Sequence, residues 1–284
     1  MTAINNSMLD AMRDRRSAGE SLGKLAKEIG LPWQRLWTML YPSTSAGRPS
    51  ARGERSRAVL RPNPSVASLT EKYRPVSLDT IWGQDAVVKV LRKFAAAPYP
   101  TAFIFEGETG TGKTSAALAL ASAIGCDLTQ KEFGGVQTIA SGEQSADAVR
   151  EAYRQMFNCT WHGSGWKVVI VNEADRMARP AETIWLDVLE AIPAKTVIIF
   201  TTNESQRLSQ RFLDRCARLA FQSDAATVEP ALRELLDEMW RAETGDNRAP
   251  KDVIDRLVRE TTQDGRLSFR RAVQALAVHL AGRE

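Results

Sequence analysis

The stretch Phe103-Ile-Phe-Glu-Gly-Glu-Thr-Gly-Thr-Gly-Lys-Thr-Ser115 organises the rest of the sequence. It begins with three apolar residues, the kind of short run that a buried strand needs. Gly107, Gly110 and Gly112 follow, and glycine lets the backbone turn tightly while its N–H groups stay accessible. Residues 116–123 are good helix formers. The stretch therefore predicts a strand, a tight turn and a helix in succession.

The pattern in this stretch, Gly-x-x-x-x-Gly-Lys-Thr, is that of a P-loop, and a strand before it and a helix after it are the context that the motif requires. Backbone N–H groups and a helix N-terminus together bind polyphosphate anions. We expect Lys113 to reach the β- and γ-phosphates of ATP and the Thr114 hydroxyl to hold Mg²⁺. The predicted cofactors are thus ATP and Mg²⁺, and the predicted cofactor-binding residues of the loop are Glu108, Thr109, Gly110, Thr111, Gly112, Lys113, Thr114 and Ser115.

The bulk composition is that of an ordinary globular protein. With 284 residues, the chain has room for one large domain and one small one. No apolar run approaches the roughly 20 residues of a membrane-spanning helix, and the N-terminus has no apolar signal segment. The three cysteines are widely spaced, which fits neither a metal site nor a disulfide framework. We therefore expect a cytoplasmic protein with no membrane partner.

Residues 1–42 predict a small all-helical domain. Two amphipathic segments within residues 21–40 are separated by Gly30, a helix stop, and Pro32 suits the first turn of the second helix. This pattern is typical of a helix-turn-helix whose second helix binds DNA. The alternative is a helical docking module that binds no nucleic acid. In the DNA-binding interpretation, the available side chains are Trp33, Gln34, Arg35, Trp37 and Thr38.

Residues 43–68 predict a basic flexible linker, because they are rich in Ser, Pro, Gly and Arg and poor in large apolar residues. Five arginines lie between residues 43 and 61, against a single acid, Glu54. Such a tether beside a helix-turn-helix suggests contacts with DNA phosphates, for which Arg48 and Arg52 are our candidates. A solvated spacer is the alternative interpretation.

The remaining residues predict an α/β core followed by helices. Apolar runs at residues 136–139, 167–171 and 196–202 predict further strands of a parallel sheet, and polar residues follow the last two, at the edge where such sheets bind ligands. From Asp224 onward the pattern is helical. We therefore expect a P-loop core over residues 69–222 and a C-terminal helical lid over residues 223–284.

The segment from Leu69 to Gln84 contains Tyr-Arg-Pro and Gly-Gln elements. It resembles the segment that opens the small subunits of replication factor C and related AAA+ clamp loaders. In that family these two elements lie against the adenine. The resemblance therefore implies that the base is bordered by Tyr73, Arg74, Pro75, Gly83 and Gln84.

The resemblance continues to the C-terminus and implies catalytic roles. The run Asn-Glu-Ala-Asp at residues 172–175 resembles the Walker B element of the family, Asp-Glu-Ala-Asp. In this role Glu173 would polarise the attacking water, and Asn172, standing in place of the usual Asp, would hold Mg²⁺ through water. Asn203 matches sensor 1, a polar side chain that orients water near the γ-phosphate.

Two arginines are implied to complete the catalytic set. Asp214-Arg-Cys216 resembles the Ser-Arg-Cys element of the family, whose arginine enters the nucleotide site of a neighbouring subunit, so Arg215 is the candidate finger. Arg207, Arg211 and Arg215 recur every four residues and are predicted to share one helix face, for which a solvated basic face is the alternative interpretation. Arg270 falls on the sensor 2 position, with Arg271 as its near competitor.

These observations predict an ATP-dependent, DNA-associated AAA+ ATPase that assembles on DNA as a homo-oligomeric ring or spiral, as in DNA replication. One alternative is a mobile-element or phage ATPase that recruits a recombinase or a helicase, as in DNA recombination, and the predicted helix-turn-helix favours it. Another is an ATP-binding switch with little hydrolysis, suggested by Asn172. A recombinase, a helicase or a sliding clamp are the protein partners that these interpretations allow.

The predicted DNA contacts can be tested by deleting residues 1–64. We expect weaker DNA binding and a shallower dependence of affinity on salt, because the predicted recognition helix and the tether arginines are removed together. The measurement is a DNA titration at several salt concentrations. Unchanged affinity with an unchanged salt slope would place DNA binding elsewhere in the chain or nowhere.

Overall fold

The computed structural model describes residues 8, 28, 29, 60, 63, 68–129, 135–158 and 163–282. The chain divides into two units, Met1–Ser56 and Arg57–Glu284, and nearly all described residues belong to the second. The predicted helix-turn-helix and linker therefore lie almost wholly outside the described residues. The same holds for every predicted DNA contact, namely Trp33, Gln34, Arg35, Trp37, Thr38, Arg48 and Arg52.

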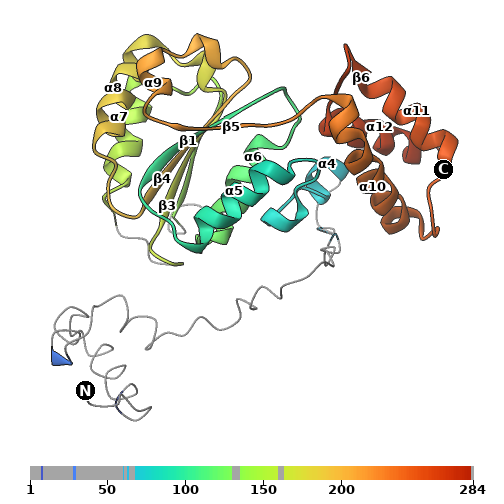
Figure 1. The fold of residues 1–284 in the computed structure, drawn as a ribbon, viewed down its shortest axis with the longest axis horizontal. Coiled ribbons are helices and arrows are strands. Elements are labelled where there is room, and N and C mark those ends of the chain that lie inside the picture. Colours follow the sequence, from blue (N-terminus) through green and yellow to red (C-terminus); the bar gives the residue numbers. More distant parts are fainter. Residues whose placement is uncertain are drawn as a thin grey trace. The chain divides into compact units, whose positions relative to one another are not determined.

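A five-stranded parallel sheet forms the centre of the second unit (Figure 1). Its order is β2-β3-β4-β1-β5, so that β4 lies between β3 and β1. The predicted parallel α/β core is thereby confirmed. The strands are β1 (Thr101–Glu106), β2 (Val136–Ile139), β3 (Lys167–Val171), β4 (Thr196–Thr202) and β5 (Ala217–Ala220).

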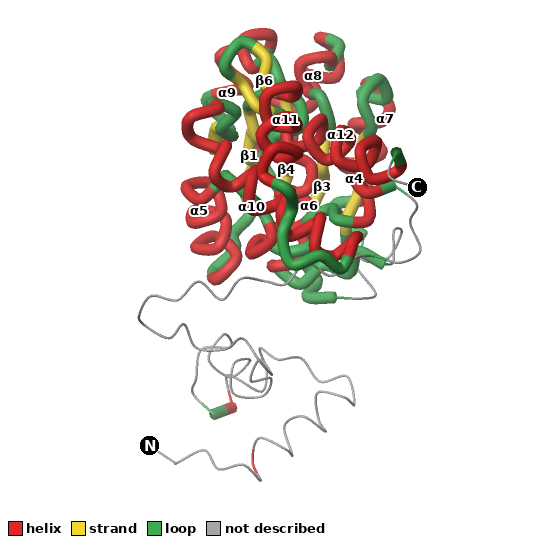
Figure 2. The backbone as a smooth tube through the Cα atoms, turned by 90° about the vertical axis from the view of Figure 1, so that its right-hand side faces the viewer, coloured by secondary structure: helices red, strands yellow, loops and turns green. Residues whose placement is uncertain are grey.

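Helices cover both faces of this sheet, as Figures 1 and 2 show. Alternate residues of a strand point to opposite faces, and in β1 Phe103 and Phe105 pack with α5 (Asp85–Ala96) and α6 (Lys113–Ala123). Ile104, between them, packs on the other face. That face is covered by α7 (Ala146–Gln155), α8 (Arg179–Glu190) and α9 (Gln210–Leu213).

The lid has its own apolar core. It consists of α10 (Ala225–Thr244), α11 (Lys251–Thr261) and α12 (Phe269–Ala281), with a short hairpin of β6 (Thr262–Gln263) and β7 (Arg266–Leu267) between the last two helices. The sequence did not predict the hairpin. The segment that precedes the sheet, which we call the arm, consists of α4 (Leu69–Lys72) and the following Tyr73. The arm also packs here, because Tyr73 belongs to the lid's core.

The predicted arginine stripe is wrong as a helix face. Arg207 ends the short 3-10 helix η3 (Ser205–Arg207), whereas Arg211 lies in α9 and Arg215 follows that helix. The break occurs because Leu208 is extended and Ser209 caps α9 by accepting a hydrogen bond from the Phe212 N–H. The three arginines therefore occupy separate local structures.

Within the part of the chain that the structure describes, no helix combines the length and the apolar character that crossing a bilayer requires.

Candidate nucleotide-binding site

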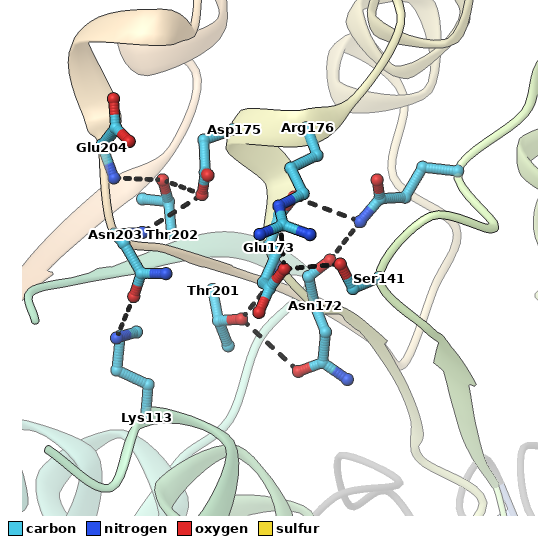
Figure 3. Close-up of polar contacts among 11 residues, drawn as sticks. Lys113, Ser141, Asn172, Glu173, Asp175, Arg176, Thr201, Thr202, Asn203 and Glu204 are labelled. Carbon is cyan, nitrogen blue, oxygen red and sulfur yellow. Dashed lines mark hydrogen bonds and ion pairs between the residues drawn. The ribbon is translucent and has the colours of Figure 1, made fainter. Parts of the chain in front are cut away.

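The strand order gathers the predicted site at one edge of the sheet. The P-loop follows β1, the acidic residues follow β3, and Asn203 follows β4, which lies between these two strands. Because all three strands run in parallel, their carboxyl ends lie side by side. Asn203 is consequently placed between Lys113 on one side and Asp175 on the other (Figure 3).

The P-loop residues leave β1 and turn into the N-terminus of α6. Gly112 caps this helix with a φ of 95°, a left-handed conformation that glycine adopts without strain, and a Cβ built there would meet nothing within 4 Å. The space beside the first turn of α6 is thus open to a ligand. A helix N-terminus with accessible backbone N–H groups favours phosphate.

Lys113 is the first residue of α6 and is only 8% exposed. Its Nζ donates hydrogen bonds to the carbonyl oxygens of Gly107 at 2.7 Å and Glu108 at 2.9 Å, and to Asn203 Oδ1 at 2.9 Å. The pKa of Lys113 is lowered to about 8, chiefly by burial and in part by the charge of Arg270, while the carboxylates of Asp175 and Glu173 oppose the shift. The ammonium group therefore loses its proton over a range of pH that is accessible to experiment.

The residues predicted to hold Mg²⁺ contact each other. The Thr114 hydroxyl donates to Asn172 Oδ1 at 3.0 Å, and the Thr201 hydroxyl donates to the same oxygen at 3.4 Å. Hydroxyl and amide oxygens are hard ligands of the type that Mg²⁺ accepts, usually with several waters retained. The donor set therefore fits the ion, although it has one carboxylate fewer than the usual Walker B element.

Glu173 leaves β3 in a strained conformation. Its φ is 52°, in the left-handed region that is unfavourable for residues other than glycine. Two neighbours hold the backbone there: the Glu173 N–H donates to Thr201 Oγ1 at 3.2 Å, and the buried Gln144 amide donates to the carbonyl oxygens of Asn172 and Glu173. The carboxylate contacts Arg176 at 3.1 Å and accepts a hydrogen bond from Ser141 (Figure 3).

Asp175 connects the end of β3 to Asn203. Its Oδ1 accepts hydrogen bonds from the Thr202 hydroxyl at 2.7 Å and from the Asn203 N–H at 3.1 Å. Because Asn203 in turn accepts from Lys113, a continuous chain of hydrogen bonds joins the ends of β3, β4 and β1. Asp175 thus orients Asn203, which itself contacts the P-loop lysine.

The lid closes the other side of the site. A Cβ at Gly110 would lie 2.1 Å from Ser268 Oγ and 3.2 Å from the Cβ of Arg270, so only glycine permits this approach. Arg270 lines the cavity between lid and P-loop, whereas the Arg271 guanidinium donates to the Gln263 side chain. The structure therefore places Arg270, rather than its competitor Arg271, beside the P-loop.

The cavity has a volume of about 390 Å³. Its polar end contains the P-loop together with Asn172, Glu173 and Asn203. The end toward the lid is mostly apolar, with Ile81, Trp82, Leu235, Met239, Phe269 and Val273. The predicted cofactor-binding residues that line it are Tyr73, Arg74, Pro75, Thr109, Gly110, Thr111, Gly112, Lys113, Thr114 and Ser115.

Other predicted residues lie outside the cavity lining of the described chain. Gly83 sits behind Phe269, since a Cβ there would be 2.8 Å from the ring. The Gln84 amide instead exchanges two hydrogen bonds of 2.8 Å with the backbone of Gln222, just before the lid. The Glu108 carboxylate pairs with Arg266 on β7, although its carbonyl oxygen contacts Lys113.

Arg215 is also absent from the described lining of the cavity. Its guanidinium pairs with Glu190 at 2.5 Å and donates to the Arg211 carbonyl oxygen at 2.9 Å.

Sequence reasoning missed Thr201 and Gln144, which hold the Asn172–Glu173 turn. A signal existed for Thr201, because it is a polar residue at the carboxyl end of an otherwise apolar strand, where parallel sheets bind ligands. No comparable signal existed for Gln144, whose burial depends on the folded loop.

Curated proteins similar to this chain are subunits of replication factor C. The replication factor C small subunit of Picrophilus torridus is 29% identical over 202 residues, covering 66% of this chain and 63% of that protein. Replication factor C subunit 3 of Saccharomyces cerevisiae is 32% identical over 160 residues, covering 54% and 44%. The chain therefore spans about half to two thirds of the length of these relatives.

Solved structures show the same fold at low sequence identity. A DNA polymerase III gamma subunit-related protein from Thermotoga maritima superposes with a TM-score of 0.51 at 19% identity, over 68% of this chain and 60% of that one. The RuvB Holliday junction branch migration motor of Thermotoga maritima gives a TM-score of 0.51 at 16% identity, over 72% of each chain. These likenesses confirm the predicted P-loop AAA+ core.

The family model described as DNA polymerase III, delta subunit, matches residues 83–225, just over half of the chain. This match and the replication factor C relatives confirm the resemblance seen in the sequence, while neither tests the N-terminal helix-turn-helix. The chain thus belongs to the DNA polymerase III delta subunit family, with the AAA+ core of clamp-loader-like proteins.

Proposed function

We propose that the protein is an ATP-dependent, DNA-associated AAA+ ATPase that works as an oligomer, in the manner of a clamp loader subunit. The observation that carries the proposal is the buried Lys113 ammonium at the N-terminus of α6, hydrogen-bonded to Asn203 and lining a cavity beside Thr114 and Asn172. A cation, a helix N-terminus and hard oxygen ligands together suit the phosphates of ATP and Mg²⁺.

Each residue has a chemical role in this proposal. Lys113 and the N–H groups of the P-loop bind the phosphates, and Thr114 and Asn172 hold Mg²⁺, which supplies neutralisation of the charge on the phosphate oxygens. Glu173 accepts a proton from the attacking water, and Asn203 orients that water. Arg270 contacts the γ-phosphate from the lid.

The proposal extends to an assembly of several subunits on DNA. The curated relatives are named as subunits, which supports action within a larger complex. Arg215 would then enter the nucleotide site of the next subunit, and residues 1–64 would contact DNA. A sliding clamp, a recombinase or a helicase is the proposed protein partner.

Two observations favour a second candidate, an ATP-binding switch with little hydrolysis. Asn172 supplies an oxygen but no negative charge to the Mg²⁺ site, and the Glu173 carboxylate is engaged by Arg176 and Ser141. Both features slow turnover without weakening the phosphate contacts of the P-loop. Measuring ATP turnover with and without DNA separates the switch from the ATPase.

The pKa of Lys113 gives a first prediction. Because the protonated lysine binds phosphate and its pKa is about 8, ATP affinity should fall about tenfold between pH 7 and pH 9, as the protonated fraction falls from about nine tenths to about one tenth. Lys113→Arg should keep its charge and show a flat profile, and Lys113→Ala should bind weakly at both values. Fluorescence titration with labelled ATP measures this. Wild-type affinity in Lys113→Ala would refute the site.

Asn172 gives a second prediction. Asn172→Asp restores a negative charge beside Thr114, so it should lower the Mg²⁺ concentration needed for half-maximal turnover and raise the rate of hydrolysis. The measurement is a Mg²⁺ titration of the ATPase rate. Asn158→Asp makes the same change at an exposed position and is the matched control. Superimposable curves for wild type and Asn172→Asp would leave Asn172 without a regulatory role.

Arg215 gives a third prediction. Arg215→Ala should bind ATP normally but hydrolyse it slowly, since arginine fingers contribute about 10³–10⁵ in rate in other NTPases. Mixing Arg215→Ala with Glu173→Gln should restore activity, because some interfaces then combine an intact finger with an intact site. The exposed neighbour Arg211 provides the control variant, Arg211→Ala. A lack of rescue in confirmed mixed assemblies would show that the arginine does not act between subunits.

A further inference from the structure

Helix α10 runs along the apolar end of the nucleotide cavity. Leu235 and Met239 line the cavity, and Glu243 follows Met239 by four residues, which places it on the same face of the helix one turn further on. No part of the sequence resemblance or of the proposed mechanism gives Glu243 a role. This position makes Glu243 a candidate for controlling the shape of the cavity at its apolar end.

The partner of Glu243 is the arm that precedes the sheet. The Tyr73 hydroxyl donates a hydrogen bond to Glu243 Oε1, and the Lys72 ammonium lies 2.7 Å from the same oxygen. The two segments are 170 residues apart in the sequence. One carboxylate therefore fastens two consecutive residues of the arm to the last turn of α10.

This contact differs from an ordinary surface ion pair. Tyr73 is only 6% exposed, belongs to the lid's apolar core, and also lines the cavity. A buried hydroxyl needs a partner, and a charged acceptor gives it a stronger hydrogen bond than a neutral one. Burial and the Glu243 carboxylate raise the pKa of Tyr73, whereas Lys72 and Tyr73 lower the pKa of Glu243 against the effect of its burial.

The apolar surroundings of Tyr73 indicate which part of a ligand it contacts. The ring lies with Trp82, Leu235 and Met239, while the cations Lys113 and Arg270 mark the phosphate end of the cavity. A flat, uncharged group such as a nucleobase fits the first environment, and phosphates fit the second. A change in the placement of Tyr73 should therefore alter binding of the base and leave binding of the phosphates unchanged.

We propose that Glu243 is a positioning residue that holds the Tyr73 ring as a wall of the base-binding end of the cavity. The inference rests on the proposed function, since it assumes that the ligand is ATP. Lys72 helps to hold the Glu243 carboxylate in place, since its ammonium group pairs with that carboxylate. The arm and α10 thus form one wall, although 170 residues separate Tyr73 from Glu243 in the sequence.

The test compares two probes, ATP and inorganic tripolyphosphate, each with Mg²⁺, by isothermal titration calorimetry on the full chain. Glu243→Ala and Tyr73→Phe should weaken ATP binding about tenfold, a loss comparable to one hydrogen bond to a charged group, and should leave tripolyphosphate binding within about twofold. Glu243→Gln keeps an acceptor and should lose less. Glu260→Gln, an exposed carboxylate on α11, is the matched control and should change neither affinity.

The outcomes separate this inference from the function on which it rests. Equal weakening of both probes in Glu243→Ala and Tyr73→Phe, or no weakening of either, would overturn the role of Glu243 while wild-type ATP binding upholds the site. If Glu243→Ala fails to fold, Tyr73→Phe decides, because it retains the buried ring. Failure of the wild type to bind either probe would overturn the proposed function, and the inference with it.

Discussion

The constraint on which the site depends is the burial of the Lys113 ammonium group. Burying an ammonium group is unfavourable unless oxygen atoms replace its hydration. The buried Lys113 Nζ donates hydrogen bonds to three such oxygens. Two are backbone carbonyl oxygens of the P-loop, so the loop must curl around its own lysine. The third is the side chain of Asn203, so β4 must end within reach of the loop. The burial of one charge thereby fixes both the shape of the loop and its distance from the neighbouring strand.

The strand order makes this arrangement possible and extends it. Because β4 lies between β1 and β3, its last residues contact both neighbours: Thr201 bonds to Asn172 and Glu173, and Thr202 and Asn203 bond to Asp175. β1 and β3 are not neighbours in the sheet, so the P-loop and the residues after β3 are joined through β4 and through the hydrogen bond from Thr114 to Asn172. The lid is tied to the same structure at Gly110, where the absence of a side chain allows Ser268 to approach.

The sequence predicted best those features that depend on residues close together in the chain. The P-loop, four of the strands and the polar residues at their ends could be predicted, because strand periodicity and the turn chemistry of glycine are local properties. β5 was missed because it is only four residues long and three of them are exposed. Its sequence therefore shows no run of large apolar residues of the kind that marks a buried strand. The arginine stripe was mistaken for a helix, because spacing alone does not reveal that Leu208 is extended and that Ser209 starts a new helix.

Long-range contacts were beyond prediction for a different reason. The Gln84 amide was expected beside the base, but its partner is the backbone of Gln222, 138 residues away. The contact of Tyr73 with Glu243 is of the same kind. A polar side chain carries no local indication of which distant backbone or carboxylate will satisfy it, so such contacts appear only once the fold is known.

The replacement of the Walker B acid by Asn172 has two opposite electrostatic effects. It removes a negative charge from the Mg²⁺ site, which weakens attraction for the cation. It also removes repulsion between that position and the phosphates, and it leaves Lys113 and Arg270 facing the cavity with less opposing charge. Asp175 and Glu173 keep their negative charges, but the carboxylate of Asp175 is held by Thr202 and Asn203, and that of Glu173 by Arg176 and Ser141, rather than by Thr114. If Asn172 holds Mg²⁺ as proposed, the site favours the nucleotide relative to the metal, so that ATP binding and turnover depend on Mg²⁺ to different degrees.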